Sequence, residues 1–145
     1  MILVAVSGGY DPLHIGHVRQ IQHAATLGDV LLVLLNSDAW LDRKKGFHCM
    51  AWEARREILQ GLRWVSAVVP VDDRDGTVAS AITLYRPHIF AKGGDQLVPV
   101  KAERQACWAV KCRMVFGIGN KVESSSAFIR HGYMRLLPRI GLGAV

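Results

Sequence analysis

The chain has 145 residues, enough for one domain that buries most of its unfolded surface without disulfides or a structural metal. Half of its residues are hydrophobic and 21% are charged, a composition that excludes an intrinsically disordered chain. The net charge of +6 is compatible with nucleic-acid binding, but a cationic site for phosphorylated small molecules accounts for it equally well.

Cysteine usage and the first residues predict a cytoplasmic protein that does not enter a membrane. Cys49, Cys107 and Cys112 are an odd number of cysteines without a CxxC pair, which is typical of unpaired thiols in a reducing compartment. The N-terminal apolar run lacks a preceding basic region and is too short for a signal peptide or a membrane span. We therefore expect a single cytoplasmic domain over residues 1–145.

Short apolar runs alternate with helical patterns along the chain. The apolar runs cover residues 2–6, 30–35, 65–71, 88–91 and 112–116. Helical patterns begin near residues 15, 52, 78, 99 and 123. This alternation predicts an α/β fold, namely a Rossmann-like, open, parallel five-stranded sheet with helices on both faces.

The turn after the first apolar run combines glycines with two histidines. Gly8 and Gly9 let the backbone turn tightly and approach a ligand closely. The helix that follows has free N–H groups and a positive dipole end, which together make an anion site. His14 and His17 are three residues apart, so they lie on the same side of the first helical turn. The turn therefore predicts a phosphate site beside two imidazoles.

Two imidazoles beside a phosphate have three candidate roles. Metal binding is disfavoured, because no third His, Cys or carboxylate lies nearby at ligand spacing. General acid–base catalysis stays open, although an attacking group that is already an anion does not need it. Donation of N–H groups to charge that develops on a phosphoryl group requires only positioning. We favour donation by His14 and His17.

The motif His14-Ile15-Gly16-His17 resembles the HxGH motif of the cytidylyltransferase-like nucleotidyltransferases. Class I aminoacyl-tRNA synthetases share these four residues, but the position near residue 15 of a short chain favours the small nucleotidyltransferases. Residues 86–95 are similar to the RPDxxVKGGD segment of the adenylyltransferase domain of ADP-heptose synthases, and residues 51–59 resemble a helix of that domain. The resemblance runs from about Ile2 to about Arg130.

Four segments are candidates for contacts with phosphates or nucleotide. Arg43-Lys44-Lys45-Gly46 reads as a loop at the ligand edge of the sheet, and the resemblance implies that Lys44 or Lys45 contacts phosphates. Three serines at the start of the last helix either bind phosphate or cap the helix, and the resemblance favours phosphate. Beside the catalytic candidates His14, His17, Lys44 and Lys45, we expect the nucleotide at Gly8, Gly9, Tyr10, Asp11, Gly16, Lys92, Gly93, Asp95, Ser124, Ser125, Ser126 and Arg130.

The second substrate is expected beside residues 38–63. Asp38 follows the second apolar run, and Arg55 and Arg63 lie on the helix that begins near residue 52. Pairing with neighbouring glutamates is the simplest account of Arg55, whereas the resemblance implies that an arginine at the helix end, best matched by Arg63, contacts the substrate phosphate. The same helix is expected to bury Ala54, Ile58 and Leu62. The acidic residues 72–75 predict a solvated turn rather than a metal site.

The resemblance implies transfer of a nucleoside monophosphate, from ATP by preference, to a small phosphorylated substrate such as a sugar 1-phosphate, with release of pyrophosphate. Mg²⁺ would bridge phosphate oxygens with few protein ligands, and Asp11 is a candidate for an indirect contact. A CTP-dependent glycerol-3-phosphate-type cytidylyltransferase is the alternative, although residues 117–120 lack the arginine that many of these enzymes carry.

A non-catalytic nucleotide- or RNA-binding module is the alternative from another class of function. The aromatic content of 8% makes base-stacking platforms scarce, and we expect no nucleic-acid partner and no membrane. Residues 131–145 are too apolar for a free tail and are expected to pack on the domain or on a second subunit, in a homodimer.

Overall fold

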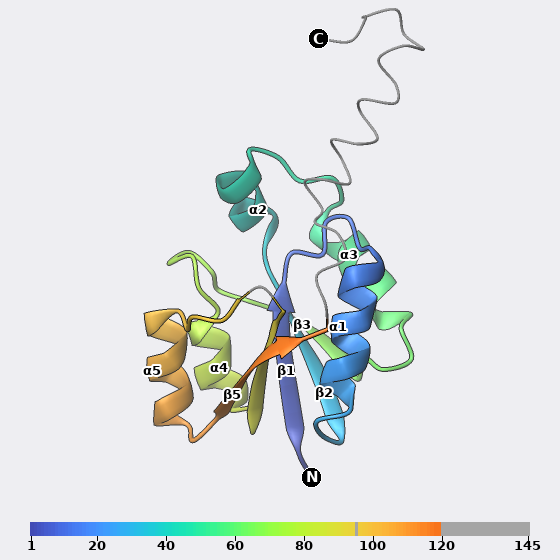
Figure 1. The fold of residues 1–145 in the computed structure, drawn as a ribbon. Helices are drawn as coiled ribbons and strands as arrows, with labels where there is room; N and C mark the ends of the chain where they lie inside the picture. Colours follow the sequence, from blue (N-terminus) through green and yellow to red (C-terminus); the bar gives the residue numbers. More distant parts are fainter. Residues whose placement is uncertain (95, 120–145) are drawn as a thin grey trace, which may run out of the picture.

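We describe residues 1–94 and 96–119 of a computed structural model of the chain. Strands and helices alternate along it (Figure 1). The strands are β1 (Leu3–Gly8), β2 (Val30–Leu35), β3 (Ala67–Pro70), β4 (Ile89–Gly93) and β5 (Arg113–Ile118). The helices are α1 (Ile15–Ala25), α2 (Asp38–Lys45), α3 (Trp52–Gln60), α4 (Ala79–Tyr85) and α5 (Lys101–Ala109).

All five strands are parallel and form one sheet in the order β3-β2-β1-β4-β5. Val4 of β1 pairs with Leu31 of β2 on one side and with Ile89 of β4 on the other. The chain builds outward from β1 to β3 and then returns to place β4 on the other side of β1. This reversal puts the switch point of the sheet between β1 and β4, and the predicted fold is confirmed.

The strands are buried on both faces because helices cover each of them. Helices α1 and α3 lie over one face, and α4 and α5 lie over the other (Figure 1). Residues of β2 alternate between the two cores: Val33 packs with Ile21 of α1, whereas Leu34 packs with Ile82 of α4. Such two-sided burial explains why the strands read as continuous apolar runs.

Several predicted boundaries differ from the structure. Residues 43–46, predicted as a loop, are the last turn and C-cap of α2. Strand β4 continues through Lys92 and Gly93, and β5 continues to Ile118, both of which were expected in loops or turns. Within the described residues, no helix is long and apolar enough to cross a membrane.

The face that α3 buries also differs from the prediction. Ile58 is 43% exposed, whereas Arg55 and Leu59 are buried. The apolar pattern misplaced this face because a charged residue, Arg55, takes one of the inward positions. Asp95, Ser124, Ser125, Ser126, Arg130 and the tail at 131–145 lie outside the described residues, so the expectations about them stay predictions.

Candidate active site

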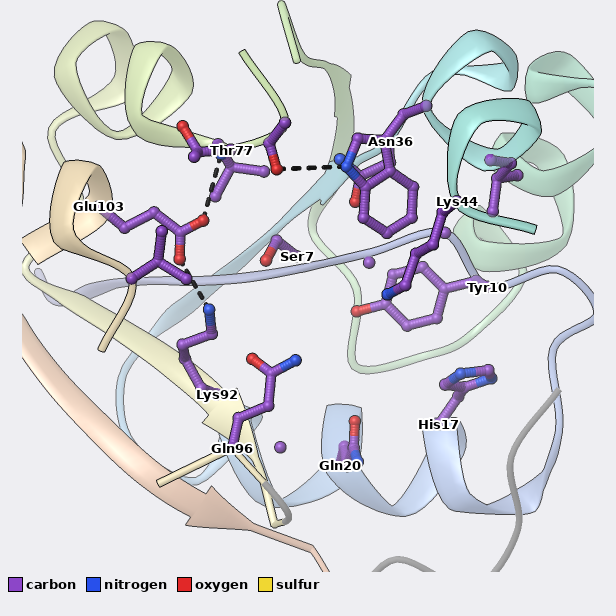
Figure 2. Close-up of a pocket in the computed structure, with 18 of the residues that line it drawn as sticks. Ser7, Tyr10, His17, Gln20, Asn36, Lys44, Thr77, Lys92, Gln96 and Glu103 are labelled. Carbon is purple, nitrogen blue, oxygen red and sulfur yellow. Dashed lines mark hydrogen bonds and ion pairs between the residues drawn. The ribbon is translucent and has the colours of Figure 1, made fainter. Parts of the chain in front are cut away.

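A cavity opens at the carboxyl end of the sheet, beside the ends of β1 and β4. Its volume is about 750 Å³, and its walls come from the turn after β1, helices α1 and α2, the segment before α4, and residues 96–103 (Figure 2). Open α/β sheets bind ligands at this position, outside the carboxyl ends of the strands at the switch point. We therefore take this cavity as the candidate active site.

The two histidines of the turn begin helix α1 and bind its first backbone groups. His14 is the N-cap residue, and its Nδ1 atom accepts a hydrogen bond from the Gly16 N–H at 3.1 Å. The His14 N–H in turn donates to Nδ1 of His17 at 3.2 Å, so the pair forms a capping box. Their rings are stacked, with centroids 3.8 Å apart. The imidazoles thus lie side by side, as their spacing predicts.

These hydrogen bonds decide where each imidazole carries its proton. Because Nδ1 of each ring accepts a hydrogen bond, the proton of each ring is on Nε2. Burial, together with the neighbouring His14 and Lys45, lowers the pKa of His17 to about 3. His17 is therefore neutral at pH 7. A ring whose Nδ1 is occupied and whose Nε2 is protonated is a hydrogen-bond donor and not a base.

The glycines of the turn make room for neighbouring side chains. A Cβ atom at Gly9 would lie 2.6 Å from Cδ2 of Leu41, and one at Gly8 would lie 3.1 Å from the ring of Tyr10. Tyr10 is buried, its φ of 50° lies in the left-handed region, and its ring meets that of His17 edge-on. Burial raises the pKa of the Tyr10 hydroxyl. The residues of the turn therefore pack closely against neighbouring side chains, and Tyr10 packs against His17.

Helix α2 brings two lysines to the cavity. Lys44 and Lys45 both line it. The Nζ atom of Lys45 donates to the main-chain carbonyl of Asp11 at 3.2 Å, and Nζ of Lys44 lies 4.6 Å from the ring centre of Trp40. Figure 2 shows Lys44 on the same side of the cavity as His17, and the charge of Lys45 acts on the His17 ring, so both ammonium groups lie near the histidines.

A buried aspartate fixes the start of α2. The Asp73 carboxylate accepts hydrogen bonds from the Asn36 side chain at 3.0 Å, from the Ser37 N–H at 2.8 Å and from the Ser37 hydroxyl at 2.7 Å. Asp73 is only 3% exposed, so the prediction that residues 72–75 form a solvated turn is wrong for this residue. Its burial follows from these donors, which replace water around the carboxylate.

Lys92 lies in the cavity wall as half of an ion pair. Its Nζ atom donates to Oε1 of Glu103 at 2.7 Å, and both side chains are buried. Gly93 also lines the cavity, and a Cβ there would meet the Gln20 amide. The expected flexible loop at 92–95 is therefore, at Lys92 and Gly93, the end of a strand.

The sequence model of the Cytidylyltransferase-like family matches residues 5–127, a span that contains every element of the cavity wall. The chain belongs to the cytidylyltransferase-like family of nucleotidyltransferases. This membership confirms the resemblance read from the HxGH motif and the predicted class of enzyme.

Relatives of this nucleotidyltransferase are known in several bacteria. It is 41% identical over 95 residues to the bifunctional protein HldE of Pelobacter propionicus. The aligned residues make up 64% of this chain and 19% of that protein. It is 33% identical over 117 residues to HldE of Koribacter versatilis, 78% of this chain and 24% of that protein. The chain thus spans about a fifth to a quarter of the length of these curated relatives.

A solved structure shows the same fold. The lipopolysaccharide core biosynthesis protein from Thermoplasma volcanium GSS1 aligns with a TM-score of 0.68 at 22% identity, over 83% of this chain and 98% of that one.

Two residues of the nucleotidyltransferase that were predicted to contact ligands form hydrogen bonds inside the protein instead. The Asp11 carboxylate is 1% exposed and accepts the N–H groups of Cys49 at 2.6 Å and Met50 at 2.9 Å. The Arg55 guanidinium is 1% exposed and donates to the carbonyls of three segments and to Asp38. Neither residue lines the cavity, and both join the histidine turn to the segment between α2 and α3.

The other two candidates for the second substrate are also away from the cavity. Asp38 pairs with Arg55 at 2.6 Å. Arg63 follows the end of α3 and stacks on Trp64, just before β3 begins. Crossover helices run antiparallel to the strands, so a helix end lies at the amino edge of the sheet, opposite the cavity. The structure therefore does not bring Arg63 to the cavity. The start of α3, rather than its end, lies at the carboxyl edge of the sheet.

Several cavity residues were missed by the sequence analysis, among them three polar or aromatic side chains. Gln20, Trp40 and Glu103 line the cavity. Glu103 had a signal in the sequence, since it shares the buried face of α5 with Ala106 and Cys107 at helical spacing. Gly16 is buried inside α1, and its N–H donates to Nδ1 of His14, which lines the cavity. Among the described residues, no group of three His, Cys, Asp or Glu side chains could hold a metal ion.

Proposed function

We propose that the chain transfers a nucleoside monophosphate, with ATP as the favoured donor, to the phosphate of a sugar 1-phosphate. The observation that carries this proposal is the stacked pair of imidazoles, which present Nε2–H groups on the same side of one cavity as two lysines. The similarity of residues 86–95 to adenylyltransferase domains of ADP-heptose synthases favours ATP and a sugar phosphate over CTP and an alcohol phosphate.

The reaction is a displacement at the α-phosphorus of the triphosphate. A phosphate oxygen of the sugar 1-phosphate forms a bond to the α-phosphorus, and the bond from that phosphorus to the oxygen bridging to the β-phosphorus breaks. Pyrophosphate leaves with the electron pair of the broken bond. The attacking oxygen is already anionic, so neither a protein nucleophile nor a general base is needed.

The residues of the cavity supply positioning and charge stabilisation. The Nε2–H groups of His14 and His17 donate to oxygens of the transferring phosphoryl group, where negative charge develops. The Gly16 N–H at the start of α1 is already bonded to His14, so the further donors are Lys44 and Lys45, which bind phosphate oxygens on the same side of the cavity. Because Asp73 holds the start of α2, both lysines approach from a fixed direction.

Magnesium would be held mainly by the phosphates. Glu103, which lines the cavity, pairs with Lys92, and Asp11, which lies outside the cavity, accepts two backbone N–H groups. This donor set fits an ion that keeps several waters and takes most of its other ligands from a triphosphate. When bound, Mg²⁺ supplies charge neutralisation on the triphosphate.

Asparagine variants of the histidines test the proposal. In His14→Asn and His17→Asn the side-chain oxygen still accepts the backbone N–H that Nδ1 accepts now, so helix α1 keeps its cap. Each variant loses an Nε2–H donor, and kcat for pyrophosphate release should fall by about 10² to 10³ while triphosphate affinity is kept. Activity is measured with ATP and with CTP, each with a panel of sugar 1-phosphates and with glycerol 3-phosphate.

His23→Asn is the matched control. His23 lies on the same helix, and its Nδ1 also accepts a backbone N–H, from Gly119 at 2.8 Å, but it does not line the cavity. Its kcat should equal that of the unaltered protein. Full turnover in both His14→Asn and His17→Asn would overturn the proposed role, and no pyrophosphate release with any sugar 1-phosphate would overturn the proposed substrate class.

A further inference from the structure

The cavity has a second polar end, away from the histidines. Lys92 of β4 and Glu103 of α5 line it there, and Figure 2 shows the pair across the cavity from His17, Tyr10 and Lys44. Lys92 is 8% exposed and Glu103 is 5% exposed, so the pair is largely removed from solvent. The proposed phosphoryl chemistry uses neither residue.

The pair has hydrogen-bonding capacity that the described protein groups do not use. Lys92 Nζ carries three protons, and its hydrogen-bond acceptor among the described residues is Oε1 of Glu103 at 2.7 Å. The carboxylate has about four acceptor positions, of which Lys92 and the Val78 N–H, at 3.3 Å from Oε2, occupy two. Donors and acceptors thus stand side by side in the cavity wall.

This combination selects for uncharged hydroxyl groups. A phosphate only accepts hydrogen bonds and would be repelled by Glu103, and an ammonium group only donates and would be repelled by Lys92. A hydroxyl group does both, so two adjacent hydroxyls could accept from Lys92 and donate to Glu103 at once. Thr77 and Gln96, which line the same end, are uncharged and can also both donate and accept.

Stability alone is a weak reason for such a pair. Burial of two charges removes their hydration, and well-packed apolar residues of similar volume are often at least as stabilising. The surrounding core already contains apolar residues, such as Val78 and Phe90, that could pack with apolar replacements. A role in ligand recognition gives a reason for a buried donor and acceptor at a cavity wall.

We propose that Lys92 and Glu103 form a specificity site that hydrogen-bonds adjacent hydroxyl groups on an uncharged, polyhydroxylated part of a ligand. The proposal rests on the proposed function, which supplies two sources of such hydroxyls: the sugar of the acceptor and the ribose of the nucleotide. In either case the phosphates lie at the histidine end and the hydroxyls at the Lys92–Glu103 end.

Calorimetric binding to a double variant tests this site without any need for turnover. Lys92→Gln with Glu103→Gln keeps the net charge and the approximate size of the pair but removes its charged donor and acceptor. Two ligand pairs are compared: glucose 1-phosphate with methyl phosphate, and ATP with inorganic tripolyphosphate. The second ligand of each pair has the phosphates without the hydroxyls.

The expected result is that the double variant loses about tenfold to a hundredfold of its preference for the hydroxylated ligand, which corresponds to lost hydrogen bonds to charged groups. Binding of methyl phosphate and tripolyphosphate stays unchanged. A loss confined to glucose 1-phosphate assigns the site to the acceptor sugar, and a loss confined to ATP assigns it to the ribose. Unchanged preferences in both pairs, or no preference in the unaltered protein, would overturn the proposal.

Two further measurements separate recognition from folding. The same substitutions at exposed positions, Lys111→Gln with Glu57→Gln, are the control and should leave both preferences intact. If the double variant does not fold, deoxy ligands replace it: the unaltered protein should bind 2-deoxyglucose 1-phosphate or 2′-deoxy-ATP more weakly than the parent ligand by a similar factor. Equal affinities would overturn the proposal. Inactivity of the protein toward every acceptor would instead refute the proposed function, and the binding results could still be interpreted because they do not depend on turnover.

Discussion

The two ends of the cavity use lysine in opposite ways. At the histidine end, Lys45 donates to a neutral main-chain carbonyl, and the imidazoles beside it present N–H donors. At the other end, Lys92 is neutralised by a carboxylate 2.7 Å away. The first end therefore suits an anion, and the second suits a neutral group that both donates and accepts.

This contrast shows that the charge a lysine offers to a ligand depends on its partner in space. Lys92 lies in a Lys-Gly-Gly-Asp segment that the sequence associates with a nucleotide, yet its counter-charge comes from Glu103 on the following helix. Lys44 and Lys45 lie in a run of cations that would ordinarily be a solvated surface, yet both reach the cavity.

The largest effect should come from replacing Arg55, which hydrogen-bonds the turn that carries the histidines. Arg55→Met leaves the carbonyls of Gly9, Asn36 and Met50 without this donor and breaks the pair with Asp38. Loss of one partner from a buried charged network costs about 3–5 kcal/mol of unfolding free energy. Urea unfolding measures this loss.

Arg56→Met is the matched control for that experiment. Arg56 is the next residue on α3 and is exposed, so its replacement should change the unfolding free energy by no more than about 0.5 kcal/mol. Equal unfolding free energies for the two variants would show that Arg55 does not support the histidine end.

Acid should weaken the histidine end through His17. The folded-state pKa of His17, about 3, lies below its ordinary value of 6.5, so below pH 6.5 the unfolded chain binds a proton that the folded chain does not. The contribution of neutral His17 to stability is therefore complete above pH 6.5 and is lost as the pH falls toward 3, by up to about 1.4 kcal/mol per pH unit.

Urea unfolding at pH 7.5 and at pH 5.5 measures this dependence, with His17→Asn as the comparison. The variant should lose less stability between the two pH values than the unaltered protein, by about 1 kcal/mol. Identical pH dependence in both proteins would mean that folding does not lower the pKa of His17.

Salt should produce the smallest effect and should distinguish the two ends directly. An increase from about 0.1 M to about 1 M salt shortens the screening length from about 10 Å to about 3 Å. Tripolyphosphate, bound at the cationic end, should bind several-fold more weakly in high salt, whereas adenosine, which has no phosphate, should bind equally well. Isothermal calorimetry tests both ligands, and equal salt sensitivity would contradict a division of charge within the cavity.

The sequence was sufficient for the fold and for the histidine end. Continuous apolar runs predicted strands buried on two faces, and the spacing of His14 and His17 predicted imidazoles on one side of a helix start. These features depend on residues close together in sequence, so local patterns contain them.

Buried charges were the features that the sequence could not predict. Arg55 and Asp73 each lie inside the protein because their partners come from other segments, at separations that no local pattern records. The same limitation misplaced the buried face of α3, where apolar periodicity favoured Ile58 over Arg55. Arg63 lies at the amino edge of the sheet because of the direction in which α3 runs, and the composition of the helix does not reveal this direction.

The close seating of α1 has a consequence for motion. Gly119 has a φ of 63°, and a Cβ there would lie 2.9 Å from Cγ and 3.2 Å from Cα of Gln20, so α1 rests directly on the end of β5. On the far wall, Leu97 and Val98 are 70% and 80% exposed and belong to the segment between β4 and α5. We therefore expect substrates to enter and products to leave past Leu97 and Val98, while the wall that carries the histidines stays in place during turnover.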